Sequence, residues 1–507
     1  MERSSSSLGH RTGRAVGHRL LGNIAGAFIT IGSGIFLART LSPSDFGVFA
    51  IGLSLYRICD LVSSAGMLPT LVQRSEVRPA HETAAVAMQL VAAALLIGVG
   101  VLGAEPLEHW FGMAGLAPVL LVLAVGFPVR AIGLVPVAML TRSMSFGRLA
   151  IVDCTMRLAR ALAAITLVLG GYGAVALAAG VLAGVAARTL LAIILAGRLP
   201  RLARFDRNDV SELARYGGGI VSISATNELT RRIDLLTVGH AFGSELLGLY
   251  QRGFQYALMP FEYLAFAANR VFFSAMSAVK DDSTRFRRAY LMMVRFLALA
   301  VYPLVTLLVM AAHVAIPFVY GPQWASAVPF VYVLAAAVYI RIAYNACGVA
   351  VQTRGRVGAE AGRQVLFLIA MIICASIGRL FGPMAVAVGV VVAGALFLAL
   401  MLPVALDTAG VSMREWVDSL RTGTLSSAAM AVAMAVCNAV FGGSLGPAML
   451  LATLVVCGGL SYLAAVRLLA TAGDRELFGP LRERIPDRFQ PVLDLFVPAR
   501  AGGLVNP

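Results

Sequence analysis

The sequence has few charged residues for its length. Of its 507 residues, 13% are Asp, Glu, Lys or Arg, well below the ~25% usual in soluble domains, whereas 59% are apolar. The mean hydropathy is +0.84. A soluble protein of this size needs far more polar surface to cover its core. The composition therefore excludes a soluble multidomain enzyme and a disordered or fibrous chain, and it indicates a polytopic membrane protein.

The sequence also has almost no lysine and no metal-binding pattern. Lys280 is the only lysine, so arginines carry the formal charge of +15, and they are spread over short loops between apolar runs. This distribution is typical of membrane topology signals and not of nucleic-acid binding. The six cysteines each lie in an apolar run, with no CxxC pair and no Cys/His cluster. We therefore expect no disulfide, no metal and no cofactor.

Long loops are absent as well. The longest connection, around 198–212, has no room for a soluble catalytic domain, and no nucleophile–base motif is recognisable, so we do not expect an enzyme. Apolar stretches of about 20 residues predict fourteen transmembrane helices. They are 20–38, 46–66, 82–103, 115–140, 149–170, 173–197, 213–240, 245–274, 289–317, 326–351, 360–381, 383–405, 423–441 and 446–468.

The arginines predict the orientation of these helices. With the N-terminus in the cytoplasm, almost all loop arginines face inwards, and only Arg39 and Arg379 lie on outer connections. Cytoplasmic loops carry an excess of Lys and Arg, so both termini are expected inside the cell. The predicted organisation is a basic cytoplasmic N-terminal tail (1–19), an N-lobe of helices 1–6 (20–197), a cytoplasmic linker (198–212), a C-lobe of helices 7–12 (213–405), helices 13–14 (406–469) and a cytoplasmic C-terminal tail (470–507).

Two segments of the first half recur in the second half. Residues 41–52 align with 242–253, and residues 118–130 align with 329–341. Six helices per half is an even number, so both halves enter the membrane in the same direction, as parallel repeats do in transporters. We therefore predict an all-α membrane protein with two parallel-repeat six-helix lobes and two extra C-terminal helices.

Several charged side chains are predicted at membrane depth, where burying a charge costs about 2.5–3.5 kcal/mol on insertion scales. Arg57, Arg130 and Arg341 lie nearest to mid-depth, and the last two occupy equivalent positions of the repeat. They can line a polar cavity or bond a neighbouring helix, and both interpretations stay open. Five further arginines lie closer to the cytoplasmic face, where snorkelling to the headgroups explains them: Arg157, Arg160, Arg188, Arg270 and Arg295. Asp153 lies one helical turn before Arg157 and is expected to neutralise it.

Helices seven and eight supply further candidates. Additional cavity arginines are Arg231, Arg232 and Arg252. The carboxylates that could bind a coupling ion are Asp60, Glu228, Asp234 and Glu262. Arg231 and Asp234 are three residues apart on one helical face, so an internal pair is as reasonable as a site.

Three segments resemble the signatures of a known family. They are the predicted outer turn 37–49, the segment 234–250 with its three glycines, and the turn 320–329 before helix ten. In order and spacing they are similar to bacterial polysaccharide flippases of the Wzx type, in the polysaccharide transporter family of the multidrug/oligosaccharidyl-lipid/polysaccharide exporter superfamily. The similarity covers residues from about 15 to 410.

The resemblance implies two lobes around a central cavity that opens alternately to each face of the bacterial cytoplasmic (inner) membrane. It implies a substrate of undecaprenyl-diphosphate-linked oligosaccharide for exopolysaccharide, capsule or O-antigen synthesis, with membrane lipids and other polysaccharide-assembly membrane proteins as partners. Lipid flippases of this superfamily hold the diphosphate with cavity arginines, and Arg57 matches such a position in the peptidoglycan-precursor members. Those members also carry arginines in helix one, which is uncharged here from 20 to 38, and this argues against the peptidoglycan precursor.

Two other functions fit a polytopic chain. A drug/cation antiporter of the same superfamily would bind cations with the carboxylates, and the excess of membrane-depth arginine disfavours it. A polysaccharide polymerase or glycosyltransferase usually carries a sizeable outer loop with carboxylates, whereas the loop after helix three holds only Glu105 and Glu108. Arginine offers planar, permanently charged donors suited to phosphate oxygens, which favours the flippase.

Overall fold

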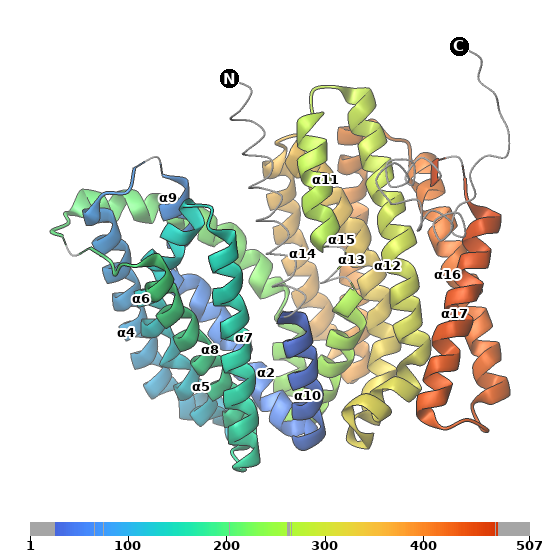
Figure 1. Cartoon of the computed structure of the whole chain (residues 1–507), viewed down its shortest axis with the longest axis horizontal. Helices are drawn as coiled ribbons and strands as arrows, with labels where there is room; N and C mark the ends of the chain where they lie inside the picture. The colour runs from blue at the N-terminus through green and yellow to red at the C-terminus, as the bar shows by residue number, and fades with distance from the viewer. Residues whose placement is uncertain are drawn as a thin grey trace. The chain divides into compact units, whose positions relative to one another are not determined.

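The computed structural model describes residues 26–64, 66–74, 76–201, 203–260, 264, 266–471 and 473–474. The regular elements within these ranges are helices, with no strand, and ten of the helices are long and apolar enough to span a membrane (Figure 1). The predicted all-α membrane fold is therefore confirmed. The chain divides into two compact units, 1–251 and 252–507, and the division falls within α10 (Ile233–Pro260).

The first unit begins with an apolar helix over Gly26–Thr40. The elements after it are α2 (Pro43–Ser64), α3 (Met67–Gln73), α4 (Pro79–Phe111), α5 (Leu116–Ala124), α6 (Gly126–Arg142), α7 (Phe146–Leu169), α8 (Gly173–Ala196), α9 (Arg207–Thr230) and the first part of α10. Glycines in the left-handed conformation set two of the boundaries, Gly66 (φ 64°) before α3 and Gly115 (φ 87°) before α5. A side chain is strained at such φ values, which is why glycine occupies these positions.

The second unit contains the remaining helices. They are the end of α10, α11 (Phe266–Ala278), α12 (Ser283–Tyr320), the 3-10 helix η2 (Pro322–Ala327), α13 (Val328–Thr353), α14 (Val357–Gly378), α15 (Pro383–Ala409), α16 (Met413–Phe441) and α17 (Pro447–Leu469). The start of α16 is fixed by a capping box, in which Ser412 and Glu415 satisfy each other's backbone N–H groups.

Predicted spans outside these ten are also helical where the structure describes them. The span 149–170 coincides with α7, which carries Arg148, Asp153, Arg157 and Arg160 and is therefore too charged to count as an apolar span. The spans 213–240 and 245–274 fall on α9, α10 and α11. Their predicted boundary coincides with a kink in α10 at Gly243, where φ is 82° and ψ is −178°.

Helical hairpins in both units are held together by glycine. A β-carbon at Gly180 of α8 would lie 2.8 Å from the carbonyl oxygen of Arg160 on α7, and one at Gly389 of α15 would lie 2.9 Å from the carbonyl oxygen of Cys374 on α14. Such contacts leave no room for a larger residue. Small residues let membrane helices approach closely and pack by van der Waals contact.

The sequence repeat is reproduced in the packing of each unit. In the first unit Gly52 of α2 packs against Val119 of α5, whose Cγ1 lies 2.5 Å from a β-carbon built at the glycine. In the second unit the aligned residue, Gly253 of α10, packs against Phe330 of α13, whose Cβ lies 3.1 Å from such a β-carbon. Val119 and Phe330 are themselves aligned, which supports the predicted repeat. The lobe boundaries stay a prediction, and the N-terminal tail 1–19 lies outside the described residues.

Candidate substrate site

The first unit contains a cluster of four arginines, one on each of four helices. Arg57 lies on α2, Arg130 on α6, Arg160 on α7 and Arg188 on α8. Their charges interact, because Arg130 is repelled by both Arg57 and Arg188, and Arg160 is repelled by Arg57. We call these four residues the arginine cluster.

Two members of the arginine cluster are paired with carboxylates. Arg130 forms an ion pair with Asp60 of α2, whose side chain is 11% exposed. Arg188 Nε lies 3.4 Å from Asp153 Oδ1 of α7, and both side chains are partly exposed. The pair between Arg188 and Asp153 differs from the expectation that Asp153 neutralises Arg157, one turn away on the same helix. The two pairs join α2 to α6 and α7 to α8.

The other two members have no acidic partner. Arg57 and Arg160 are both exposed, and among the described residues neither makes a hydrogen bond or an ion pair. Beside Arg57, the ring of Tyr56 is buried and stacks on Phe127 of α6 with a centroid separation of 4.8 Å. This contact packs α2 against α6 beside Arg57.

The arginine cluster therefore carries surplus positive charge. Its four arginines face two aspartates, Asp60 and Asp153, which leaves two positive charges uncompensated. Charges within membrane helices are costly and usually line a water-filled or ligand-binding cavity. Planar guanidinium groups are suited to bidentate binding of phosphate oxygens. The arrangement can bind a doubly charged anion.

The sequence groups Arg57 and Arg130 with Arg341 and leaves Arg160 and Arg188 outside the predicted site. One feature of the sequence pointed to these arginines. Asp153 lies within the same apolar stretch as Arg160, and a carboxylate at membrane depth needs a cationic partner. Which cation it meets depends on how α7 and α8 pack. That is decided by glycine contacts rather than by sequence spacing.

The predicted site residues near the break between α9 and α10 contact groups outside the arginine cluster. Arg232 Nε donates to Glu228 Oε1 at 2.9 Å, one helical turn apart. Arg231, at the C-terminal end of α9, is exposed. Asp234 is buried and accepts a hydrogen bond from the Tyr250 hydroxyl at 2.9 Å.

Candidates in the second unit are placed differently. The guanidinium carbon of Arg252 lies 5.0 Å from the ring centroids of both Tyr320 and Trp324, so this buried arginine anchors the end of α10 on α12 and η2. Arg341 is partly exposed on α13, and its carbonyl oxygen accepts a hydrogen bond from Asn345 at 2.7 Å. Glu262 lies outside the described residues. Within those residues no group of His, Cys, Asp or Glu could hold a metal ion.

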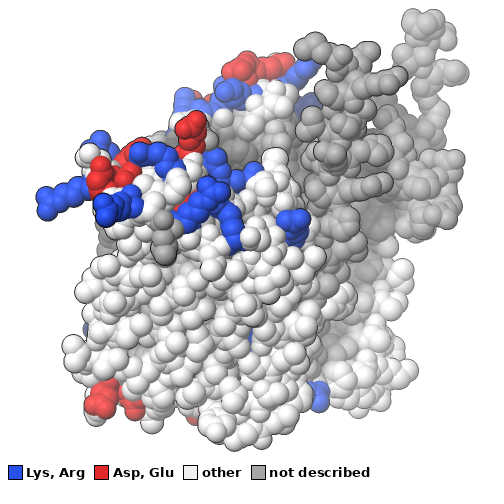
Figure 2. Space-filling model, turned by 60° about the vertical axis from the view of Figure 1, so that its left-hand side comes forward, with Lys and Arg blue, Asp and Glu red and all other residues white. Residues whose placement is uncertain are grey.

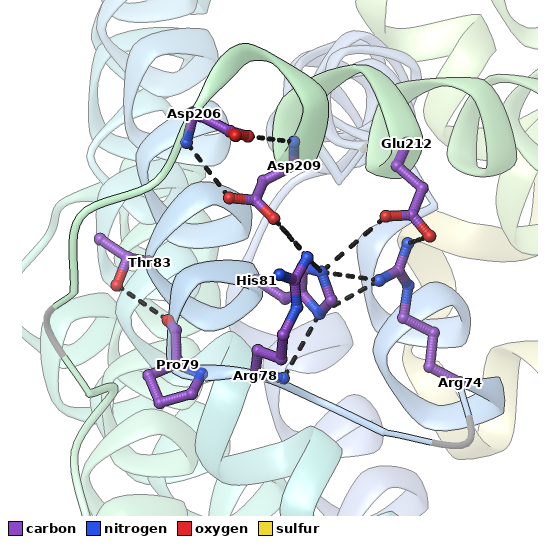
Figure 3. Close-up of polar contacts among 8 residues, drawn as sticks. All are labelled: Arg74, Arg78, Pro79, His81, Thr83, Asp206, Asp209 and Glu212. Carbon is purple, nitrogen blue, oxygen red and sulfur yellow. Dashed lines mark hydrogen bonds and ion pairs between the residues drawn. The ribbon is translucent and has the colours of Figure 1, made fainter.

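A second polar network, absent from the sequence predictions, joins the start of α9 to the segment between α3 and α4 (Figure 3). Arg78 Nη2 lies 2.7 Å from Asp209 Oδ1, and Arg74 Nη2 lies 2.6 Å from Glu212 Oε1. His81 lies between these pairs, 3.4 Å from Asp209. We call these five residues the α9 network.

The start of α9 is also capped. The backbone N–H of Asp209 donates to Asp206 at 2.9 Å, and this bond holds the pKa of the Asp206 carboxyl below its ordinary value. Figure 2 shows charged side chains gathered at one end of the helices on the face drawn, with a broad belt of uncharged residues below them. A charged end and an apolar belt are what a membrane-embedded helical unit requires.

Comparison with known proteins decides the family. Residues 36–329 match the family model described as polysaccharide biosynthesis protein. The chain belongs to this family. The match covers more than half of the sequence and includes the arginine cluster, and it confirms the resemblance found in the sequence.

Named relatives are consistent with this assignment. The chain is 26% identical over 302 residues to the succinoglycan biosynthesis transport protein ExoT of Rhizobium meliloti, covering 59% of this chain and 60% of ExoT. It is 24% identical over 337 residues to the lipopolysaccharide biosynthesis protein WzxC of Escherichia coli, covering 65% of this chain and 68% of WzxC. The match to ExoT thus spans less than two thirds of that relative.

Solved structures share the fold. The lipid II flippase MurJ in an inward closed conformation aligns with a TM-score of 0.71 at 14% identity, over 89% of this chain and 98% of MurJ. A multidrug transporter of the MATE family in an inward-facing conformation aligns with a TM-score of 0.61 at 13% identity, over 76% of this chain and 94% of that one. The chain is a multi-pass membrane protein with the fold of these transporters.

Proposed function

We propose that this protein is a flippase that moves undecaprenyl-diphosphate-linked oligosaccharide repeat units from the cytoplasmic to the outer leaflet of the bacterial inner membrane. It works by alternating access, with both termini in the cytoplasm. Its product serves exopolysaccharide, capsule or O-antigen synthesis, alongside other polysaccharide-assembly membrane proteins. The relatives ExoT and WzxC, by their names a succinoglycan transport protein and a lipopolysaccharide biosynthesis protein, support this proposal.

The surplus charge of the arginine cluster is the observation that carries the proposal. A diphosphate diester carries two negative charges and cannot cross hydrocarbon unaided, whereas its polyprenyl tail is stable in lipid. Among the described residues, no carboxylate pairs with the exposed guanidinium groups of Arg57 and Arg160, which makes them candidates to bind the diphosphate oxygens. No covalent bond forms or breaks, and the protein supplies only a polar path.

The ion pair between Arg130 and Asp60 suggests how substrate binding is coupled to uptake of a cation. When the diphosphate contacts Arg130, it competes with Asp60 for the same guanidinium group. Asp60 is then a carboxylate without a cation, and it can take up a proton or a metal cation. We propose Asp60 as the coupling residue on this ground, with Glu228, Asp234 and Glu262 as the other candidates. Arg341, Arg231, Arg232 and Arg252 remain candidate substrate contacts.

The described carboxylates that could bind a cation are already engaged by hydrogen-bond donors, which disfavours a drug/cation antiporter. Asp60 and Glu228 are engaged by arginines, and Asp234 by a tyrosine hydroxyl. A cation would have to displace a fixed positive charge from the first two. An anionic headgroup would instead meet Arg57 and Arg160, which have no acidic partner in the part of the chain that the structure describes.

Deletion of the gene and complementation test the proposal. Without the protein, undecaprenyl-linked repeat units should accumulate on the cytoplasmic side and one surface or secreted polysaccharide should be lost. The Arg57→Gln and Arg160→Gln variants should insert at normal amounts and fail to restore export, whereas Arg57→Lys should restore it partly because the charge remains but the planar fork is lost.

The matched control is Arg285→Gln, at the start of α12. Its side chain is 76% exposed and pairs only with Asp282 one turn away, so export should be normal. Normal polysaccharide with altered drug sensitivity in the deletion strain would contradict the flippase and favour the antiporter. Full export from both Gln variants would contradict the diphosphate site.

A further inference from the structure

The two repeat-related turns contact each other reciprocally within the first unit. A β-carbon at Gly47 of α2 would lie 1.8 Å from the carbonyl oxygen of Ser244, and one at Gly248 of α10 would lie 1.9 Å from the carbonyl oxygen of Pro43. Both distances are far too short for any side chain. Each glycine thus receives the backbone of the other turn.

This contact has approximate two-fold symmetry. In the alignment of 41–52 with 242–253, Gly47 corresponds to Gly248 and Pro43 corresponds to Ser244. Equivalent residues therefore exchange places across the contact, as they do in a self-complementary dimer interface. We call Pro43, Ser44, Gly47, Ser244 and Gly248 the turn contact.

The turn contact is held by weak interactions. In the described residues, the polar bond across it joins the hydroxyl groups of Ser44 and Ser244, whose oxygens are 2.6 Å apart. The rest is close backbone packing. A contact of this type loses little when it separates, in contrast to the charged α9 network.

Other helix ends gather around the same contact. The Trp110 ring at the end of α4 stacks on His240 with a centroid separation of 4.2 Å, and the Trp110 carbonyl oxygen lies 3.1 Å from His240 Nδ1. Asp45 accepts a hydrogen bond at 3.1 Å from the backbone N–H of Ala174 at the start of α8. The starts of α2 and α8 and the end of α4 all lie at predicted outer turns, so these contacts join several outer turns of the unit.

We propose that the turn contact is the outer gate of the transport cycle, and that it must separate once in each cycle to release cargo into the outer leaflet. The inference rests on the proposed function, because it assumes alternating access. The two repeats cannot move apart at the outer face while Gly47 and Gly248 each hold the other turn. Gly47 and Gly248 let the backbones of the two turns approach closely when the gate is closed. The hydrogen bond between the Ser44 and Ser244 hydroxyl groups is weak enough to break when the gate opens.

A reversible cross-link tests the gate. Hydroxyl oxygens 2.6 Å apart place the two β-carbons close to the separation that a disulfide spans, about 3.5–4.5 Å. The Ser44→Cys/Ser244→Cys variant, in a background without the six native cysteines, should therefore cross-link on oxidation. Export measured in cells or liposomes should be lost on oxidation and restored by reductant, whereas each single variant should be unaffected by oxidation.

The outcomes separate the gate from the flippase. If the reduced double variant and its cysteine-free parent fail to move the lipid-linked oligosaccharide, the proposed function fails. If both move it and the cross-linked protein moves it equally well, the gate is wrong although the function stands. Failure of the cysteines to cross-link would also overturn the gate, because the turns would not be in contact.

Glycine substitutions give a second test that needs no cysteine. Gly47→Ala and Gly248→Ala should each impair export, by similar amounts, because the two positions are symmetric. Gly98→Ala on α4 is the matched control, since a β-carbon there meets nothing within 4 Å. Equal export from all three variants would contradict the close fit on which the gate depends.

Discussion

The ion pair between Arg130 and Asp60 allows binding to be separated from stability. Removing one partner of a fully buried pair costs about 3–5 kcal/mol, because the other charge stays buried alone. Arg130 is 39% exposed and Asp60 is 11% exposed, so the cost here is smaller and unequal. Arg130→Gln strands the more buried charge and should destabilise the protein by about 1–3 kcal/mol, whereas Asp60→Asn should cost about 0–1 kcal/mol.

The double variant Asp60→Asn/Arg130→Gln decides between a ligand and a structural bond. With both charges removed, the folded amount and melting temperature in detergent should recover to nearly those of the parent. Export should stay lost, because the diphosphate still lacks one of its guanidinium groups and the proposed coupling carboxylate is also gone. Recovery of export together with stability would refute the assignment of Arg130 to the substrate. A double variant as unstable as Arg130→Gln alone would refute the ion pair as the source of the loss.

Two further predictions concern the α9 network and the topology. Asp209→Ala should lower stability by about 1–3 kcal/mol, because it removes the carboxylate that accepts from the Asp206 backbone N–H and that pairs with Arg78 and faces buried His81. Glu212→Ala, at a side chain 60% exposed, should cost about 0–1 kcal/mol. Melting in detergent measures both, and equal shifts would contradict the network. Single cysteines placed at Arg204 and Pro106 should react only with reagents in the cytoplasm and outside the cell, respectively, and reversed labelling would overturn the orientation.

The helices could be predicted from the sequence because the length of an apolar stretch is enough to specify a membrane span. The kink at Gly243 coincides with a predicted boundary between two spans, because the break between two apolar runs contains this glycine. The repeat was visible because both halves keep a glycine where a neighbouring helix packs closely, Gly52 against the Val119 side chain and Gly253 against Phe330. These features depend on local composition or on steric limits, and a linear pattern records both.

The partners of charged residues could not be predicted in the same way. Arg78 and Asp209 are 131 positions apart, and nothing in their spacing links them. Successive residues of a helix point about 100° apart, so a small rotation of a helix changes which charge faces which neighbour. The assignment of Arg188 rather than Arg157 to Asp153 depends on such a rotation. Pairing is thus a property of the packed helices.

The two aligned segments, 41–52 and 242–253, make similar packing contacts but carry different charged residues. Asp45, which bonds the start of α8, aligns with Leu246, which has no polar group to do the same. Ile51, fully buried against Gly239, aligns with Arg252, which stacks between two aromatic rings. Backbone contacts thus keep the two-fold relation that alternating access needs, while the charges are free to differ. A single headgroup needs only one charged site, and the surplus positive charge of the first unit is where we expect it to bind.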